Sequence, residues 1–433
     1  MSETSSAQTP PGGDRAALAP PAPAREDVLG RFLRANGWAL AARMFVAAGN
    51  FVRFIVFARM LRPFDFGVAV SAFVSLDVLS TFTESYMMGA LIQQEETPDE
   101  YLDTIWVSEI SRAILIAAIM IAAAKPLAAF FRLGDLYQVF WMAAVLGLVR
   151  ELQSPGIVKM FRELEYHNML ILNVVEFAAT LGFGVGAILL LKDWRGFVIG
   201  VIAGQACWAA ASYVIYPYRP RFRFQLDQAR RLFRFGKWLS AARSLQFLAQ
   251  RLDSLAVGHL LGPGLLGAYK MALNVGEVPV AEFSGGIAQV MFPTVARLSK
   301  NQPERRRVVL IGTIAVVAAG AAYAVILTLW GGPLLIWFFG AAWIGAIGPL
   351  KFLCFYGMFH GLLTLAAQTF EGIGTPAVSL ALSVVRLAAL ALIVYPLTVR
   401  FNVSGTACAA LISVIAPIPL MLMFARRTAG EAA

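Results

Sequence analysis

Long apolar segments follow one another along nearly the whole chain after residue 37, separated by short polar or Gly- and Pro-containing connections. Each is close to the roughly 20 residues that a helix needs to cross a bilayer. We count twelve such segments, at 38–58, 66–89, 104–124, 137–154, 168–191, 197–216, 239–260, 266–290, 308–330, 349–369, 379–399 and 404–425. The pattern predicts an all-α polytopic membrane protein with about twelve transmembrane helices.

The same unusual polar pattern occurs twice, 200 residues apart. The first copy contains Trp38, Ala41, Ala42, Arg43, Asn50, Arg53, Leu61, Pro63 and Gly67, and the second contains Trp238, Ala241, Ala242, Arg243, Gln250, Asp253, Leu261, Pro263 and Gly267. Seven of these nine pairs are identical. The repeat predicts two homologous lobes of six helices each. Because six is even, both lobes enter the membrane in the same sense, as in parallel-repeat transporters.

Five segments follow from this organisation. We expect a disordered cytoplasmic tail at 1–30, an N-lobe at 31–216, a basic cytoplasmic linker at 217–237, a C-lobe at 238–425 and a second cytoplasmic tail at 426–433. The first segment is rich in Pro, Ala, Ser and Gly, and it has too few large apolar groups to fold. It also lacks the apolar core of a signal peptide, so we expect it to stay on the protein.

Composition excludes an ordinary soluble domain, because 59% of the residues are hydrophobic and 14% are charged, whereas about 25% are charged in soluble proteins. The net charge of +10 follows the predicted topology and does not indicate nucleic acid binding. With a cytoplasmic N-terminus, the inner segments contain 20 Lys and Arg residues and the outer segments contain seven. The positive-inside rule then places both termini of the expected multi-pass protein in the cytoplasm.

Charged and polar residues inside the predicted spans are candidates for a central cavity, since a charge at the bilayer centre costs about 2.5 to 3.5 kcal/mol and avoids lipid. The candidate cavity cations are Arg43, Arg53, Arg243, Arg251 and Lys270; the candidate acids for H⁺ or Na⁺ coupling are Asp77, Glu84 and Glu277; and the candidate polar lining is Asn50, Gln250, Asp253 and Asn274. Arg suits a phosphate group because its planar donors match two oxygens of the anion. The alternative is that these groups pair as buried salt bridges, and whether Asp253 replaces or pairs with a cavity cation stays open.

Enzyme motifs are missing from the chain. The three histidines are dispersed, and no HExxH, Walker A or GxSxG pattern occurs. We expect His360 to be a hydrogen-bonded core residue and Arg386 to reach a membrane interface. No CxxC pair occurs, so neither a disulfide framework, a zinc site nor a cofactor is expected from Cys207, Cys354 and Cys408.

Four stretches resemble the polysaccharide transporter family, the Wzx-like oligosaccharide flippases of the multidrug/oligosaccharidyl-lipid/polysaccharide superfamily. They are ARMLRPFDFGVAV at 58–70 with its echo GHLLGPGLLGAYKMAL at 258–273; SPGIVKMFRELEYHNM at 154–169; WRGFVIGVIAGQACWA at 194–209 with YPYRPRFRF at 216–224; and LFRFGKWLSAARSLQFLAQRLDSLAVG at 232–258. Their order and spacing extend the resemblance over nearly the whole chain after residue 30.

The resemblance implies a twelve-helix fold of two lobes, alternating access, and movement of an undecaprenyl-pyrophosphate-linked oligosaccharide from the inner to the outer leaflet. It implies that cavity cations meet the pyrophosphate, with Asp253 departing from the symmetry because the first lobe has Arg53 there. Expected partners are this lipid-linked substrate, membrane lipids and polysaccharide polymerase or assembly proteins. Two other functions stay open: an ion-coupled multidrug or small-solute antiporter on the same fold, and a membrane-embedded glycan polymerase or ligase.

Overall fold

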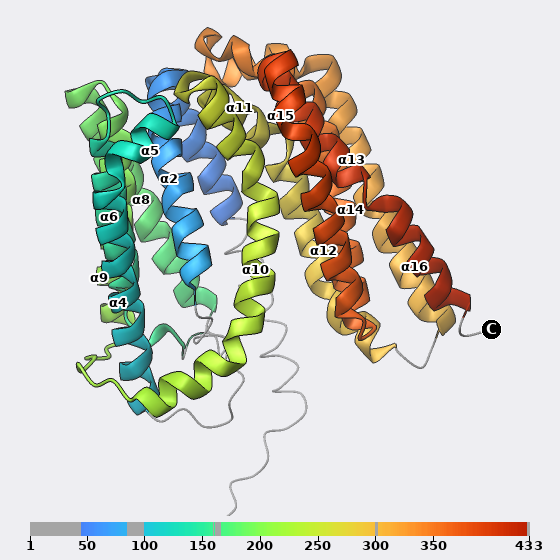
Figure 1. Ribbon diagram of the computed structural model, residues 1–433, viewed down its shortest axis with the longest axis horizontal. Helices are drawn as coiled ribbons and strands as arrows, with labels where there is room; N and C mark the ends of the chain where they lie inside the picture. Colours follow the sequence, from blue (N-terminus) through green and yellow to red (C-terminus); the bar gives the residue numbers. More distant parts are fainter. Residues whose placement is uncertain (1–44, 85–98, 159, 161–165, 299–301, 431–433) are drawn as a thin grey trace, which may run out of the picture.

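The computed structural model describes residues 45–84, 99–158, 160, 166–298 and 302–430, and within them the side chains of 99–100, 166, 226–243 and 427–430 are left aside. The described part contains helices and no strands, as predicted (Figure 1). After a first helix over residues 45–60, the N-lobe consists of α2 (Pro63–Thr83), α4 (Asp99–Ala122), α5 (Ala124–Phe130), α6 (Gln138–Glu151), α8 (Tyr166–Leu191) and α9 (Trp194–Ile215). The C-lobe consists of α10 (Leu226–Leu261), α11 (Pro263–Gly276), α12 (Val278–Arg297), α13 (Gln302–Phe339), η1 (Ala341–Ala346), α14 (Ile347–Gly372), α15 (Pro376–Ile415) and α16 (Ile418–Gly430).

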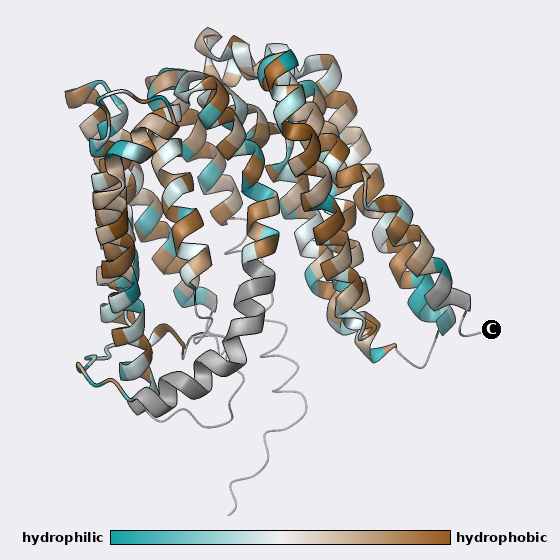
Figure 2. Cartoon of the chain, viewed as in Figure 1, coloured by the Kyte–Doolittle hydropathy of each residue, from teal (hydrophilic) through white to brown (hydrophobic). Residues whose placement is uncertain are grey.

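Seven helical stretches within the described residues are long and apolar enough to cross a membrane. Hydrophobic residues occupy most of the length of the helices in both lobes (Figure 2). Two predicted spans, 379–399 and 404–425, are joined within α15 at Asn402, whose φ of 53° and ψ of −141° interrupt the helix. The all-α membrane fold is confirmed, whereas the count of twelve spans stays a prediction.

Small residues allow the closest helix packing in the N-lobe. Gly196, Gly200 and Gly204 recur every fourth residue along α9 and face α8. A Cβ atom added at Gly200 would lie 2.5 Å from the Cα atom of Gly184. Without side chains at these positions, the two backbones approach closely, which is the usual basis of helix association in membranes.

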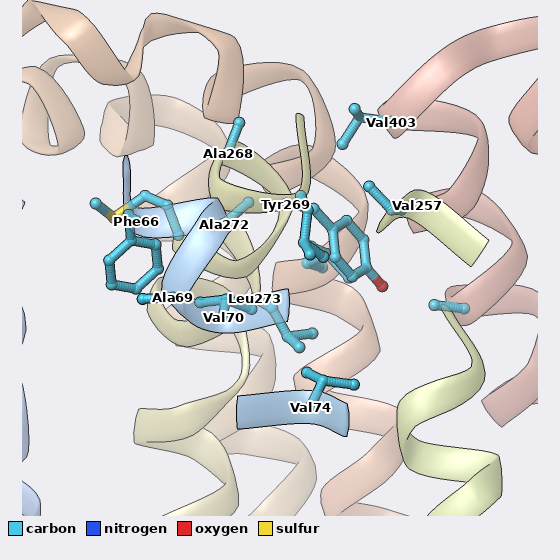
Figure 3. Packing of buried hydrophobic residues seen from close by; sticks show 14 of the residues in the cluster. Phe66, Ala69, Val70, Val74, Val257, Ala268, Tyr269, Ala272, Leu273 and Val403 are labelled. Carbon is cyan, nitrogen blue, oxygen red and sulfur yellow. The ribbon is translucent and has the colours of Figure 1, made fainter. Parts of the chain in front are cut away.

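The two lobes meet where the repeated sequences begin their second helices. Pro63 and Pro263 occupy the first turns of α2 and α11, where a proline costs no helical hydrogen bond. A Cβ atom added at Gly67 would overlap the carbonyl oxygen of Pro263, and one added at Gly267 would overlap that of Pro63. The contact is therefore reciprocal, as expected for two related lobes. Beyond it, Ala69 and other apolar side chains of α2 pack beside those of α11 (Figure 3).

Hydrogen bonds close the same end of the molecule. The indole Nε1 of Trp343, which is fully buried in η1, donates to the carbonyl oxygen of Ala58 at 2.8 Å. Arg59 donates through Nε to the carbonyl oxygen of Phe338 at 2.7 Å, and through Nη2 to that of Trp337. We call these three bonds the inter-lobe latch. Together with the α2 and α11 crossing, they join the first helix and α2 to the C-lobe.

We expect Gly267→Val to destabilise the protein, because its side chain would force α2 and α11 apart at a backbone contact. Overpacking typically costs about 1 to 3 kcal/mol. The matched control is Gly264→Val, also in the first turns of α11, because nothing lies within 4 Å of a Cβ atom there. Thermal unfolding in detergent measures the difference. Equal melting temperatures for the two variants would contradict the proposed close contact.

Candidate functional site

An aromatic chamber of about 1040 Å³ lies between the lobes, bounded by the first helix, α2, α9, α11, α12 and α13. Its lining is Ala47, Ala48, Asn50, Phe51, Arg53, Phe54, Phe57, Phe66, Val70, Phe73, Phe197, Asn274, Val278, Pro279, Glu282, Phe283, Gly286, Ile287 and Tyr323. Phenylalanine rings dominate these walls, and few polar side chains reach them.

A polar chamber of about 380 Å³ adjoins the aromatic chamber, and the two share Val70, Phe73, Asn274, Val278 and Glu282. Its other lining residues are Val74, Asp77, Gln250, Arg251, Lys270, Leu273, Glu277, Ala281 and Tyr356. The structure therefore brings together six of the residues selected from the sequence, which are Asp77, Gln250, Arg251, Lys270, Asn274 and Glu277. They come from α2, α10, α11 and the junction that follows α11.

Lys270 is the most unusual group in the polar chamber. Only 5% of the residue is exposed, and its Nζ atom has no hydrogen-bond partner among the described residues. An ammonium group carries three donors, and burying them unpaired in an apolar medium is costly. A ligand or water in the chamber would supply the missing acceptors.

Arg251 and Asp77 face each other loosely across the same chamber. One carboxylate oxygen of Asp77 lies 3.8 Å from Nη2 of Arg251, and the other lies 3.8 Å from Nη1 of Arg150. These separations are longer than hydrogen bonds. The Arg251 guanidinium also lies over the ring of Phe247, 5.4 Å from its centroid. Its planar donors therefore remain available to an anion.

Arg53 lines the aromatic chamber but already has a counter-ion. Its Nη1 donates to Oε1 of Glu176 at 2.8 Å, and its Nη2 donates to Oδ1 of Asn50 at 2.7 Å. Our sequence reasoning missed Glu176, although an acid inside the apolar segment 168–191 was a visible signal. For this pair, the structure shows the salt-bridge alternative.

Asp253 lies inside the C-lobe and is not among the residues that line the chambers. It is 3% exposed and accepts a hydrogen bond from the hydroxyl of Tyr269 at 2.5 Å. Its other oxygen accepts from the backbone N–H and the hydroxyl of Ser254. The repeat-equivalent residue of Arg53 thus stabilises the packing of α10 against α11.

Three other selected residues are not placed in the chambers. Arg43 lies outside the described residues, and the side chain of Arg243 lies outside the described part of α10. Glu84 caps the end of α2 and is not among the lining residues. Their predicted roles stay predictions.

Glu277 lies at a break between α11 and α12 that its neighbours explain. Proline at 279 has no N–H, so the carbonyl group of Val275 loses its helical partner. The hydroxyl of Tyr323, in α13, donates to this carbonyl oxygen at 2.6 Å. Interrupted helices whose freed backbone groups are satisfied by neighbours are tolerated in membranes, and they often bound transporter binding sites.

A third cavity, the C-lobe chamber, lies on the other side of Glu277 and has a volume of about 490 Å³. His360 lines it, and the Nδ1 atom of this histidine lies 2.8 Å from Oε1 of Glu277. Arg386 also lines it, is only 7% exposed, and donates through Nη2 to the hydroxyl of Tyr356 at 2.7 Å. The expectation that Arg386 reaches a membrane interface is wrong, because the residue is buried. His360 is largely enclosed and paired with an acid, which agrees with the expected core position.

Fold and cavity together define a class of protein, a helical membrane protein with two lobes joined at one end and charged residues enclosed between them. Over residues 56–348 the chain matches the family described as polysaccharide biosynthesis protein. It belongs to that family, and the resemblance that its sequence motifs indicate is confirmed.

Relatives in this family are distant. The chain is 22% identical to the lipopolysaccharide biosynthesis protein WzxC of Escherichia coli (strain K12) over 332 residues, which are 75% of this chain and 66% of WzxC. It is also 22% identical to the succinoglycan biosynthesis transport protein ExoT of Rhizobium meliloti (strain 1021), covering 79% of this chain and 69% of ExoT. The chain thus spans about two thirds of the length of these relatives.

Solved structures share the fold. The inward closed conformation of the lipid II flippase MurJ superposes with a TM-score of 0.76 at 11% identity, covering 90% of this chain and 87% of MurJ. An inward-facing multidrug resistance MATE family transporter of the MOP superfamily gives a TM-score of 0.68 at 14% identity, covering 92% of this chain and 99% of the transporter. The predicted two-lobe architecture is therefore confirmed.

We expect Tyr323→Phe to reduce stability, because it leaves the carbonyl oxygen of Val275 without its donor. A buried polar group left unpaired costs about 1 to 3 kcal/mol. The matched control is Tyr395→Phe, because Tyr395 is 63% exposed on α15. Unfolding by SDS in mixed micelles measures both variants, and a loss as large in the control as in Tyr323→Phe would contradict this account of the helix break.

Proposed function

We propose that the protein is a flippase that moves undecaprenyl-pyrophosphate-linked oligosaccharides from the inner to the outer leaflet of a bacterial inner membrane. The single observation that supports this most is the unpaired ammonium group of Lys270 in the polar chamber, beside Arg251, in a member of the polysaccharide biosynthesis family. A pyrophosphate placed between these two cations would provide the acceptors that Lys270 lacks.

Binding an anion in the polar chamber would lower the free energy of the buried Lys270 ammonium group. A buried ammonium group is penalised in the empty protein, and hydrogen bonds between charged partners contribute about 1.5 to 3 kcal/mol each. Binding an anion therefore removes a penalty and adds favourable contacts. Arg251 adds a planar donor set, because its nearest acid is 3.8 Å away.

The polar chamber also contains acids, which would repel an anionic ligand if they had no basic neighbours. Glu277 is in contact with His360, and Asp77 lies between Arg150 and Arg251. These two acids therefore have basic neighbours at ion-pair distance, whereas Lys270 has no hydrogen-bond partner among the residues that the structure describes. The unsatisfied group in the chamber is a cation, which favours an anionic ligand.

The volumes and positions of the two adjoining chambers suit a head group larger than phosphate. The polar chamber alone, at about 380 Å³, is near the lower end of ligand pockets. The aromatic chamber extends it by about 1040 Å³ and gives room for attached sugars, whose apolar faces suit aromatic walls. The prenyl chain would stay in the lipid, where it keeps its apolar contacts with the acyl chains.

Sidedness follows from combining the closed end with the charge distribution. The crossing of α2 and α11 and the inter-lobe latch lie at the end opposite the basic segment 217–237. If that segment is cytoplasmic, as the positive-inside rule predicts, the lobes are closed on the outer side. Alternating access would then require the latch to open and the lobes to close at the cytoplasmic side. Both termini would be cytoplasmic, and polysaccharide polymerase or assembly proteins would use the product.

An ion-coupled antiporter of drugs or small solutes is the second candidate. It is favoured by the three acids of the polar chamber, Asp77, Glu277 and Glu282, which would suit a cationic solute. Drug export by reconstituted protein, with no movement of a lipid-linked oligosaccharide, would support this candidate over the flippase.

We expect Lys270→Met to reduce flipping of a lipid-linked oligosaccharide in proteoliposomes about tenfold or more, which corresponds to one lost charged contact. Stability of the ligand-free protein should not fall, because replacing an unpaired buried charge by an apolar side chain removes a desolvation cost. Arg251→Gln should act in the same direction, with a smaller effect on stability than on flipping.

The control is Lys351→Met, because Lys351 is exposed at the start of α14 and lines none of the three chambers. It should flip the substrate at the wild-type rate. Unchanged flipping in Lys270→Met, or a loss of flipping matched by an equal loss of stability, would contradict a direct role in binding the head group.

A further inference from the structure

The contact between Glu277 and His360 forms part of the partition between two cavities. Glu277 lines the polar chamber, His360 lines the C-lobe chamber, and their nearest atoms are 2.8 Å apart. Their side chains are 17% and 16% exposed, so both are largely enclosed by protein. An acid paired with a histidine is a group that can gain or lose a proton near neutral pH. Here it can be reached from either cavity.

Polar side chains line the C-lobe chamber beside His360. Thr364, Gln368 and Glu371 follow His360 along α14, and Ser379 and Ser383 face them from α15. The volume of about 490 Å³ is many times what one water molecule needs. The chamber extends toward the turn that joins α14 to α15. Water there would give His360 a route for proton exchange that does not pass through the substrate chambers.

Charged and titratable groups surround the pair from every neighbouring element. They are Asp77 from α2; Arg251 and Asp253 from α10; Tyr269 and Lys270 from α11; Glu282 from α12; Tyr356 and Glu371 from α14; and Arg386 from α15. The cations Lys270 and Arg386 act electrostatically on Glu277. Arg251 and the acids Asp253, Glu277 and Asp77 act in the same way on Lys270.

A proton on His360 would add one positive charge to this group of residues. An anion in the polar chamber, next to Lys270, would be attracted by that added charge. Occupation of the chamber by an anion and protonation of the imidazole therefore favour each other, and this linkage is reciprocal. The Glu277 carboxylate, 2.8 Å from the Nδ1 atom, would stabilise the charged imidazole as an ion pair.

We propose that His360 is a proton-binding site that takes up one proton from water when the anionic head group enters the polar chamber, and releases it when the head group leaves. The inference rests on the proposed function, because the head group is the anion. The added proton cancels one negative charge of the substrate. This lowers the net charge that moves with the lobes through the membrane.

The test measures proton uptake when detergent-solubilised full-length protein binds a short-chain prenyl pyrophosphoryl sugar. Each phosphate of this probe has one ester bond and one anhydride bond, so its remaining acidic oxygen is already ionised and the probe itself exchanges no proton near neutral pH. A pH indicator in weakly buffered solution should report about one proton taken up per bound probe. In the range above neutral pH, lowering the pH by one unit should raise the affinity for the probe by up to about tenfold. His360→Gln should bind the probe with no proton uptake and a flat pH profile.

The matched control is His259→Gln, because His259 lies at the end of α10, contacts the carbonyl oxygen of Phe130 and lines none of the chambers. It should behave as wild type. A second measurement observes the imidazole directly. The chain has three histidines, so ¹⁵N spectra of labelled protein should show one imidazole changing from neutral to protonated on binding, with that signal missing in His360→Gln.

Each outcome separates the two proposals. Binding of the probe by wild type without proton uptake would overturn the role of His360 while leaving the flippase proposal intact. Equal uptake in wild type and His360→Gln would do the same, by assigning the proton to another group. No binding by wild type at any pH would overturn both.

Discussion

The crossing of α2 and α11 is the contact on which the rest of the structure depends. Each helix begins with proline and has glycine four residues later, and each glycine faces the carbonyl group of the other helix's proline. No side chain can separate the backbones there, so this is where the lobes come closest. The aromatic and polar chambers lie on the far side of it, between helices that diverge. A duplicated sequence thus produces both the joint between the lobes and the space beside it.

The charged residues inside the predicted spans differ in the partners that they contact. Arg53 is neutralised by Glu176, and Arg112 lies between Glu109 and Glu151, so these cations stabilise the N-lobe. Lys270 differs in having a charge and, within the described part of the chain, no hydrogen-bond acceptor. Where a bilayer protein retains such a group, the missing partner is expected from outside the chain.

Sequence periodicity predicted the features that depend on local spacing or internal repetition: the helical class, the two lobes and six residues of the polar chamber. It could not predict partners that fold together from distant segments. Glu176 is 123 positions from Arg53, and no spacing rule links His360 to Glu277. Asp253 shows a further limit. It occupies the position in the second repeat that Arg53 occupies in the first, but it lies in the interior of the C-lobe and is bonded to Tyr269. Repeat equivalence fixes the position on a helix but not the surroundings of a changed side chain.

The inter-lobe latch consists of donors from Arg59 and Trp343 bonded to backbone carbonyl groups, with no carboxylate among its acceptors. Neutral acceptors are much less sensitive to dissolved ions than a carboxylate would be, since screening acts mainly between charges. Every L-residue supplies the same carbonyl, so sequence drift at 337 and 338 leaves the acceptors intact. The inter-lobe latch would therefore keep its strength over a wide range of salt concentration, while the side chains that line the chambers can change without affecting it.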